Sequence, residues 1–296
     1  MKRSKLTLFA ATIGVASLAL TACSSGGGGG DDAPGSTLQR LQDEGSITVA
    51  IADERPYSWI GEDGEPTGAT IALHKEIFSR LGIDEVEVTE VDFPSLIPGL
   101  TANRFDAISA SMSILPDRCE QAAFTKPELM YTTGLLVPKG NPEGLTDLDS
   151  VLAKDGSVTL AVMGGAIEQG YAEQLGISNV IQVDNVSQGI EVVQTGRADV
   201  FSHSSASLNW LTKDLDDVEA TDAFVQTIDG VEQIGAGATV FNLDAPELVE
   251  AYNEEFQKIL DDGDAYLKLI EPFGFTAENL PPADLTTEQL CAGDLG

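Results

Sequence analysis

Residues 107–124 combine an apolar strand with polar groups that can bind an anion. Small and apolar residues lead to Ser111 and Ser113, then a proline and Asp117 interrupt the strand, and Arg118 follows directly. A guanidinium just past a strand end, beside hydroxyls and free backbone N–H groups, can hold a carboxylate with two hydrogen bonds. The alternative is a solvated arginine in a helix that Asp117 caps. Arg118 is therefore a candidate ligand for a carboxylate group.

Two further strand ends carry side chains suited to the positive end of a ligand. Residues 46–53 predict a first strand, and Glu54 and Tyr57 follow it. Residues 86–91 predict a second strand, and Phe93 comes shortly after it. Ligands of open α/β sheets bind outside the carboxyl ends of strands, so these side chains are placed to face a cleft. Together with Arg118 they fit a small molecule with separated charges, although a phenylalanine in this position often packs in the core.

A pair of glycines follows another predicted strand at 158–163. Gly164 and Gly165 precede Ala166 and a helical stretch. Glycines between a strand and a helix free backbone N–H groups, and the helix dipole favours an anion there. The two glycines do not match a nucleotide-binding fingerprint. The pattern predicts either a carboxylate subsite or a plain tight turn.

The elements that position these groups occur twice in the chain. Residues 95–109 contain a helix, an Arg-x-Asp turn and a strand, and residues 187–202 repeat this order. Ser204 then occupies the position that Ser111 has in the first copy. Alternation of strands and helices predicts parallel strands covered by helices. Two similar units indicate two lobes whose strand ends meet at a shared cleft.

The N-terminus has the features of a bacterial lipoprotein signal. Three basic residues precede an apolar run at 6–20, which ends in small residues before Cys23. We expect a signal peptide over residues 1–22, with lipid attached to Cys23. The alternative of a membrane anchor is weaker because the apolar run is short for a bilayer. Residues 23–37 are mostly Gly, Ser and Asp and predict a flexible linker.

The composition excludes nucleic acid as a partner. The chain has 48 Asp and Glu against 16 Lys and Arg, with a formal net charge of −32. Nucleic-acid binding needs a basic face. The acidic residues are scattered, which indicates a solvated surface. His74 and His203 lie far apart without Cys or His neighbours. We therefore expect no metal site and no cofactor.

Two cysteines remain after the one in the lipoprotein signal. Cys119 and Cys291 form an even pair in a chain that is expected to be exported. A disulfide between them is the default in an oxidising compartment. It would join the C-terminal tail to the segment beside Arg118, and two free thiols are the alternative.

Four short motifs occur in a specific order and spacing. They are Glu54-x-x-Tyr57, Ser95-Leu96-Ile97-Pro98-Gly99-Leu100, Ser111-Met112-Ser113-Ile114 through Arg118-Cys119, and Gly196-Arg197-Ala198-Asp199. Together they resemble the family 3 solute-binding proteins of ABC importers, which normally take up polar amino acids. The resemblance extends from about residue 47 to residue 275. It implies an α/β fold of the two-lobed type II periplasmic-binding-protein class, with mostly parallel sheets, helices on both faces and a two-strand hinge.

The same resemblance implies where the lobes lie. Lobe 1 is expected to comprise residues 38–133 and 239–296, and lobe 2 residues 134–238. The extended apolar runs 132–138 and 233–242 are the expected crossings between them. Binding would bend the hinge and close the lobes over the ligand.

The likeness is closer to the ectoine- and hydroxyectoine-binding branch, on the strength of residues 95–100, 116–119, 162–172 and 272–293. That resemblance implies a role for each candidate residue. These are Arg118 for the ligand carboxylate, Ser113 and the backbone near Ser111 for further hydrogen bonds, Glu54 for the positive end, Tyr57 and Phe93 for cation–π contact, and Gly165 and Ala166 for closure from lobe 2.

The chain departs from the family pattern at three of these positions. Amino-acid binders usually have an Asp where this chain has Ser204, and that Asp pairs with the ligand's α-amino group. Its loss disfavours a primary amine and leaves an amidinium acceptable. The ectoine branch tends to have an aromatic residue in place of Ser113 and a threonine in place of Ala166. One wall of the aromatic box is then either missing or supplied from elsewhere, by Trp59 or Tyr131.

The expected function is capture of a small zwitterion by a monomeric lipoprotein on the outer face of the cell membrane, for delivery to an ABC permease. Ectoine or hydroxyectoine is favoured, and a polar amino acid is the alternative. An enzyme on this fold, such as a cyclohexadienyl-type dehydratase, needs a placed acid or base. Glu54 or Glu168 could serve, but no nucleophile–base pair is visible. A receptor domain would need a transmembrane helix and a cytoplasmic module after Phe275, and the sequence shows neither.

Overall fold

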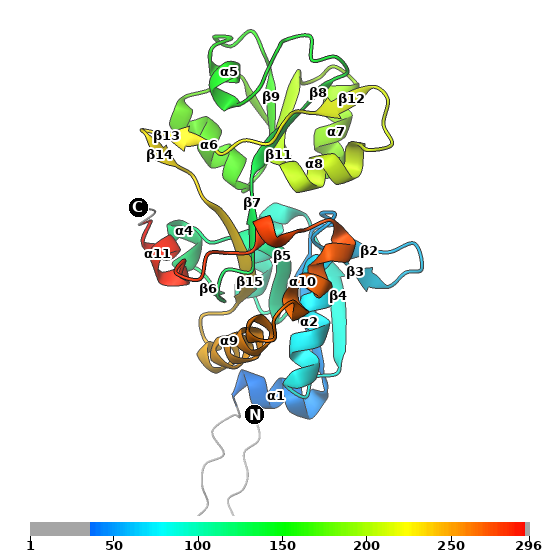
Figure 1. Ribbon diagram of the computed structural model, residues 1–296, viewed down its shortest axis with the longest axis vertical. Helices are drawn as coiled ribbons and strands as arrows, with labels where there is room; N and C mark the ends of the chain where they lie inside the picture. Colours follow the sequence, from blue (N-terminus) through cyan, green and yellow to red (C-terminus); the bar gives the residue numbers. More distant parts are fainter. Residues whose placement is uncertain (1–35, 294–296) are drawn as a thin grey trace, which may run out of the picture. The chain divides into compact units, whose positions relative to one another are not determined.

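The computed structural model describes residues 36–293, which form two sheets flanked by helices (Figure 1). The α/β architecture predicted from the sequence is confirmed. The predicted signal peptide at 1–22, Cys23 and nearly all of the predicted linker at 23–37 lie outside the described residues. Helix α1 begins directly after them, where the Ser36 side chain accepts a hydrogen bond from the Gln39 N–H and caps the first turn.

The first sheet has six strands in the order β4-β1-β5-β15-β6, and β7 pairs with β15 outside this path. Strands β4 and β5 are parallel to β1, and β15 is antiparallel to β5, β6 and β7. The strand bounds are β1 (Ser46–Ile51), β4 (Glu85–Glu90), β5 (Ala107–Ser113), β6 (Ala123–Phe124), β7 (Leu129–Tyr131) and β15 (Gly235–Phe241).

The second sheet has five strands in the order β10-β9-β11-β8-β12. Strands β10 and β11 are parallel to β9, and β8 is antiparallel to β11 and β12. Two short hairpins, β2–β3 and β13–β14, lie outside both sheets. The bounds are β2 (Trp59–Ile60), β3 (Pro66–Thr67), β8 (Thr133–Pro138), β9 (Leu160–Met163), β10 (Val180–Val183), β11 (Val200–Ser204), β12 (Val218–Ala220), β13 (Thr227–Ile228) and β14 (Val231–Glu232).

Helices pack on the sheets through their apolar faces. In α2, for example, Ile71, Ile77 and Phe78 are fully or almost fully buried. The helix bounds are α1 (Thr37–Glu44), α2 (Ala69–Arg80), α3 (Leu96–Thr101), α4 (Pro116–Cys119), α5 (Leu148–Leu152), α6 (Ile167–Leu175), α7 (Val186–Gln194), α8 (Ser205–Thr212), α9 (Pro246–Asp261), α10 (Ala265–Ile270) and α11 (Thr287–Ala292), with short 3-10 turns η1 (Phe93–Ser95), η2 (Glu271–Phe273) and η3 (Ala277–Asn279).

Both sheets are mixed, whereas the sequence predicted mostly parallel sheets. The chain passes from the first sheet to the second between β7 and β8, and it returns between β12 and β15. Strands β8 and β15 lie at these passages, and each runs antiparallel to its neighbours (Figure 1). The difference therefore arises from the crossing strands, because the β-α-β units themselves are parallel as predicted.

The internal repeat is confirmed by equivalent hydrogen bonds in the two sheets. The Asp106 backbone N–H donates to the Thr48 carbonyl, and the Thr48 N–H donates to the Asp106 carboxylate. The Asp199 N–H donates to the Thr159 carbonyl in the same way, and the Thr159 N–H donates to the Asp199 carboxylate. The aspartate of each Arg-x-Asp turn thus fixes the start of its strand against the neighbouring chain segment.

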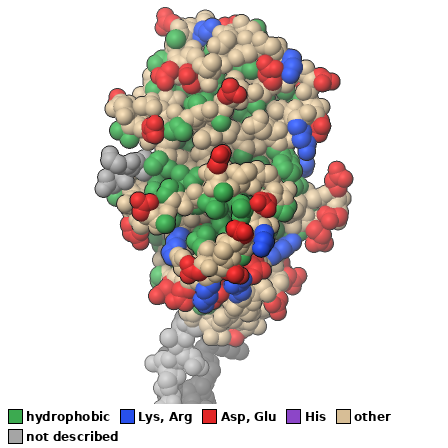
Figure 2. All heavy atoms as spheres, in the orientation of Figure 1, with side chains coloured by type: hydrophobic (Ala, Val, Ile, Leu, Met, Phe, Trp, Pro, Cys, Tyr) green, Lys and Arg blue, Asp and Glu red, His purple; other side chains and the backbone are tan. Residues whose placement is uncertain are grey.

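The predicted acidic surface is visible in the space-filling view. Asp and Glu side chains are spread over the face shown in Figure 2, and Lys and Arg side chains lie among them. Within the described residues, several pairs such as Arg40–Asp106 and Lys139–Glu219 make surface ion pairs. Exposed pairs of this kind contribute little to stability.

Candidate functional site

A pocket lies between the ends of β5 in the first sheet and of β9 and β11 in the second. Its cavity has a volume of only about 30 Å³, room for about two water molecules, so the two sides of the pocket lie close together in this structure. Seven of the nine residues predicted to bind ligand line it, and Gly165 and Arg118 do not. The lining residues are Glu54, Tyr57, Phe93, Ala110, Ser111, Ser113, Tyr131, Met163, Ala166, Ile167, Glu168, His203 and Ser204.

Glu54 contributes a buried carboxylate from the first sheet's side of the pocket. Its backbone is held in a tight turn, because the N–H groups of Tyr57 and Ser58 both donate to the Glu54 carbonyl. The side chain is 5% exposed, and the Ser207 hydroxyl donates to its Oε1 at 3.3 Å. The same oxygen lies 3.1 Å from Nε2 of His203. Glu54 therefore reaches two residues that follow or belong to β11 in the second sheet.

His203 is a pocket residue that the sequence analysis considered only as a metal ligand. It lies on β11, is 3% exposed and stacks on the Phe201 ring at 5.4 Å between ring centroids. Its contact with Glu54 is a charge contact, since neither ring nitrogen has a hydrogen-bond partner of good geometry. Burial lowers the pKa of His203, but Glu54 and then Glu168 raise it by more, so its pKa lies above the usual value. Its position beside Ser204 in the internal repeat could have identified it.

Glu168 is the second carboxylate of the pocket and comes from the first turn of α6. It is 2% exposed, and no side chain of the described residues donates a hydrogen bond to it. Burial raises the pKa of Glu168, Glu54 raises it further, and His203 and Arg118 act in the opposite direction. The sequence suggested this residue only as a potential general base. The folded chain brings it into one pocket with Glu54 and His203.

Hydroxyl groups connect the two sides of the pocket. The Tyr57 and Ser204 hydroxyls are 2.8 Å apart and hydrogen-bonded, and the Tyr131 hydroxyl is hydrogen-bonded to that of Ser113. The Tyr57 and Tyr131 rings meet edge to face at 6.1 Å. Burial, and then the charge of Glu54, raise the pKa of Tyr57 well above its usual value, so its hydroxyl stays protonated. Of the two aromatic residues proposed for the missing wall, Tyr131 lines the pocket.

Trp59, the other aromatic residue considered, lies elsewhere. It packs against Trp210 of α8 at 5.8 Å between ring centroids and against Phe273 at 5.9 Å. These contacts join the β2–β3 hairpin to a helix of the second sheet. Trp59 is therefore part of an aromatic contact outside the pocket.

Ser111 has a strained backbone and an unpaired hydroxyl. Its φ is +45°, an uncommon value for a residue with a side chain. The buried Oγ has no hydrogen-bond partner. The neighbouring β15 approaches so closely that a Cβ at Gly237 would lie 2.2 Å from this Oγ, so position 237 requires glycine. An unpaired buried hydroxyl beside a pocket is available to a ligand.

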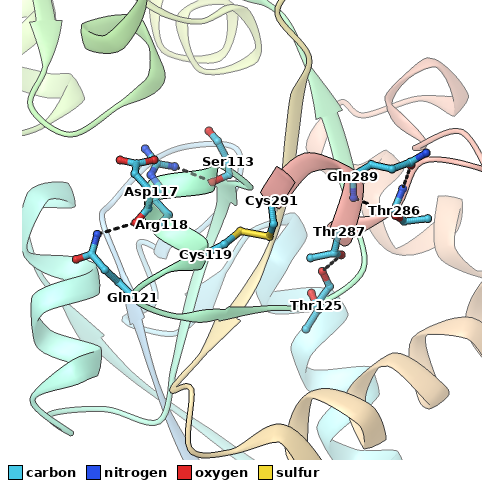
Figure 3. Close-up of a disulfide and its surroundings, with 10 residues drawn as sticks. All are labelled: Ser113, Asp117, Arg118, Cys119, Gln121, Thr125, Thr286, Thr287, Gln289 and Cys291. Atoms are coloured by element: carbon cyan, nitrogen blue, oxygen red, sulfur yellow. Dashed lines mark hydrogen bonds between the residues drawn. A yellow bond between two sulfur atoms is a disulfide. The ribbon is translucent and has the colours of Figure 1, made fainter. Parts of the chain in front are cut away.

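Arg118 does not line the pocket, but its side chain bonds to Ser113 on the first sheet's side and to Gly165 on the second sheet's side. The side chain is buried, with 6% of the residue exposed, which excludes the solvated alternative. Its guanidinium donates to the Ser113 carbonyl at 2.9 Å, as Figure 3 shows, and to the Gly165 carbonyl at 2.6 Å. It also lies 5.7 Å from the Phe93 ring centroid. Burial lowers the pKa of Arg118 from its usual high value.

The glycine turn between β9 and α6 does not offer free N–H groups in this structure. The Gly165 N–H donates to Oε1 of Gln169 at 2.8 Å, and the Ala166 N–H donates to the Met163 carbonyl. The Gly165 carbonyl accepts from Arg118. The sequence predicted either a carboxylate subsite or a plain tight turn here, and these contacts agree with the tight turn. Ala166 still lines the pocket.

A disulfide holds the C-terminal helix next to the Arg118 segment. Cys119 of α4 is bonded to Cys291 of α11 (Figure 3). The Thr287 hydroxyl of α11 also donates to the Thr125 carbonyl at 2.7 Å. The segment that carries Arg118 is therefore attached to the end of the chain at two points.

His74 is a core residue. Its Nε2 is hydrogen-bonded to the Thr239 hydroxyl at 2.6 Å, and burial lowers its pKa to about 3. Within residues 36–293, no cluster of His, Cys, Asp and Glu side chains is arranged to hold a metal ion. The helices of the same range are each too short or too polar to traverse a bilayer.

Comparison with known proteins identifies the family. Residues 47–273 match the model of the bacterial extracellular solute-binding proteins, family 3. The chain belongs to this family. The prediction from its motifs is thereby confirmed, and the two-sheet architecture described above is that of a family 3 binding protein.

Several relatives of this solute-binding protein share most of its length. A probable amino-acid ABC transporter periplasmic-binding protein of Sinorhizobium fredii (y4tE) is 35% identical over 265 residues, which are 86% of each chain. The arginine-binding extracellular protein ArtP of Bacillus subtilis is 25% identical over 281 residues, or 94% of this chain and 100% of ArtP. The crystal structure of EhuB in complex with hydroxyectoine has 32% identity and a TM-score of 0.77, covering 86% of this chain and 97% of EhuB.

Proposed function

We propose that this protein is the extracytoplasmic binding lipoprotein of an ABC transporter and that it captures a small zwitterion, with ectoine or hydroxyectoine favoured. The observation that carries the proposal is the pocket in which Glu54, Tyr57 and Phe93 lie together. A carboxylate beside two aromatic rings suits a compact cation with delocalised charge. The similarity to EhuB, whose structure contains hydroxyectoine, supports the same class of ligand.

The proposed binding step is closure of two lobes over the ligand. Lobe 1 would comprise residues 38–133 and 239–296 and lobe 2 residues 134–238, as the sequence suggests. Several polar contacts already cross between these segments, among them Tyr57–Ser204, Glu54–His203 and Arg118–Gly165. Ligand would enter the open form and exchange some of these contacts for its own. We propose that Arg118 then turns from its backbone partners to the ligand carboxylate, with Ser111 and Ser113 beside it.

A polar amino acid is the alternative ligand within the same family. The relatives named above include a probable amino-acid binder and an arginine binder. Ser204, which is hydrogen-bonded to Tyr57, has no charge to pair with an α-amino group. Replacing it by aspartate (Ser204→Asp) should shift the preference towards α-amino acids, and an unchanged ranking of ligands would contradict our interpretation of this position.

A second candidate function is catalysis, as in a dehydratase on the same fold. The observation in its favour is Glu168, a buried acid of raised pKa in a pocket with His203. A general acid must carry a proton that it can donate, and a raised pKa favours the protonated form. Incubation with prephenate or arogenate, followed by ultraviolet absorbance for an aromatic product, tests this function directly. We favour binding because the pocket residues fit an intact zwitterion without requiring a reaction.

The main test is a thermal-shift and calorimetric screen of the chain without its predicted signal. The panel contains ectoine, hydroxyectoine, glycine betaine, proline and the polar amino acids. A ligand at about 100 times its dissociation constant stabilises the folded state by about 2.7 kcal/mol, which raises the melting temperature by a few degrees. We expect ectoine or hydroxyectoine to give the largest shift. A large shift with an amino acid alone would replace the favoured ligand, and no shift with any member would contradict the proposal.

The lipid anchor is proposed separately, because Cys23 lies outside the described residues. Labelling of the full chain in cells with a radioactive fatty acid should modify the wild type and leave Cys23→Ser unmodified. Equal label in both chains would remove the anchor from the proposal.

A further inference from the structure

We infer that Glu168 is a second ligand-binding carboxylate and that the ligand's cationic group is a planar amidinium or guanidinium with N–H donors on two sides, held between Glu54 and Glu168. The inference rests on the proposed binding function and specifies the chemistry of its positive end. It depends on three features of the pocket: the balance of charge, the small number of donors to Glu168, and the aromatic rings.

The charge balance leaves room for a cation. Glu54 and Glu168 line the same pocket from the sides of the two sheets, and the charge of Glu54 disfavours the ionised form of Glu168. The one cationic side chain that lines the pocket with them is His203, and it contacts Glu54. Arg118 lies outside the lining and donates to backbone carbonyls, and from there its charge favours the ionised form of Glu168. Two buried carboxylates in a pocket lined by one imidazole form a site that a bound cation would stabilise.

Glu168 also receives few hydrogen bonds, of which its own backbone N–H supplies one. A buried carboxylate is normally satisfied by two or more donors, and leaving it unpaired is costly. No side chain of residues 36–293 donates to Glu168, while Glu54 accepts from Ser207. Glu168 lines the pocket, so a bound ligand can contact its carboxylate. A cation with N–H groups would supply further donors to this carboxylate, and a quaternary ammonium group has none to give.

The aromatic residues favour a planar cation over a compact ammonium. Tyr57 and Phe93 both line the pocket, and Tyr131 meets the Tyr57 ring edge to face. A flat, delocalised cation can stack on such rings and direct its N–H groups outward in its own plane. One edge would then face Glu54 and the other Glu168. An amidinium or a guanidinium has this geometry, and a single-point ammonium does not use both carboxylates equally well.

The test compares Glu168→Gln with Glu173→Gln by calorimetry. Glu173 lies on the same helix but is exposed, so the two variants remove equal charge and only one of them changes the pocket. The probes are hydroxyectoine and L-arginine, which carry an amidinium and a guanidinium, and glycine betaine, which has no N–H donor. We expect Glu168→Gln to weaken binding of the probe that the wild type prefers by about 10- to 100-fold. Glu173→Gln should bind normally, and Glu168→Asp should recover part of the loss.

Acetamidinium and tetramethylammonium, followed by NMR titration, separate this inference from the proposed function. If the wild type binds no zwitterion but takes up acetamidinium in a Glu168-dependent way, the proposed ligand is wrong and the inference stands. If the wild type binds hydroxyectoine or arginine and Glu168→Gln binds it equally well, the inference is overturned and the proposed function stands. Preference for glycine betaine or tetramethylammonium also overturns the inference. Absence of binding by every probe overturns both.

Discussion

Replacing Glu128 by glutamine should stabilise the protein above neutral pH and leave it unchanged in acid. Glu128 lies between β6 and β7 and is fully buried, at 0% exposure. The Thr125 hydroxyl donates to its Oε1 at 3.0 Å, and Oε2 has no partner of good geometry. Burial raises its pKa from 4.5 to about 7, although the nearby hydroxyls of Thr239, Tyr252 and Thr125 act in the opposite direction.

The size and sign of the effect follow from this pKa. Below about pH 4.5 the carboxyl is protonated in both the folded and the unfolded chain, so it has no pH-dependent cost. As the pH rises towards 7, the unfolded chain loses the proton while the folded chain keeps it, and the free energy of unfolding falls. A rise of about 2.5 pKa units corresponds to about 3 kcal/mol at most. Glutamine has the same shape without the charge and avoids this loss.

Urea denaturation of the wild type and Glu128→Gln at about pH 5 and about pH 8 measures the effect. The unfolding free energy of Glu128→Gln minus that of the wild type should be about 2 to 3 kcal/mol larger at pH 8 than at pH 5. The comparison must use this difference, because His74, with a pKa lowered to about 3, destabilises the fold in acid in both proteins. Glu120→Gln removes an exposed carboxylate and serves as the control. A difference that does not change with pH would refute the reasoning.

Three other predictions concern the contacts between the two sides of the pocket. Arg118→Ala should weaken ligand binding at least about 100-fold with the fold intact by circular dichroism, because it removes the guanidinium proposed to bind the ligand carboxylate; near-normal affinity by calorimetry would remove Arg118 from the site. Trp59 and Trp210, the two tryptophans of the chain, should give a paired near-ultraviolet dichroism signal that increases on closure and disappears in either Trp→Phe variant; a signal that survives one substitution would contradict the contact. Because Glu54 and Glu168 raise the pKa of His203, its proton competes with a cationic ligand, so affinity should rise as the pH increases above about 6.5. His203→Gln should abolish this dependence, and a pH-dependent affinity in that variant would assign the effect to another group.

Local patterns were sufficient to predict the elements and the family. Strands, helices and the Arg-x-Asp turns depend on residues close in sequence, and the equivalent bonds of Asp106 and Asp199 confirm that the repeat is structural. The position of Glu54 and Tyr57 after a strand predicted that they would face a site, since strand ends of open α/β sheets meet at a cleft. Both line the pocket together with Phe93.

The antiparallel crossings and the contacts across the pocket depended on the tertiary structure. Glu54 meets His203, and Tyr57 meets Ser204, across roughly 150 residues of sequence, a separation at which no local pattern specifies which side chains meet. The tertiary structure also decided where the Arg118 side chain points. Its place after β5 is local, but its bond to the Gly165 carbonyl requires the second sheet to approach.

The charged groups of the pocket also depend partly on local sequence and partly on the tertiary structure. The sequence alone determined that Glu168 begins a helix after a glycine turn, where a carboxylate is favourable because of the helix dipole. Only the folded chain decided that this carboxylate is 2% exposed and shares its pocket with Glu54 and His203. Burial and neighbouring charge are properties of the packed molecule, so the pKa values and the class of cation that they favour follow from the tertiary structure.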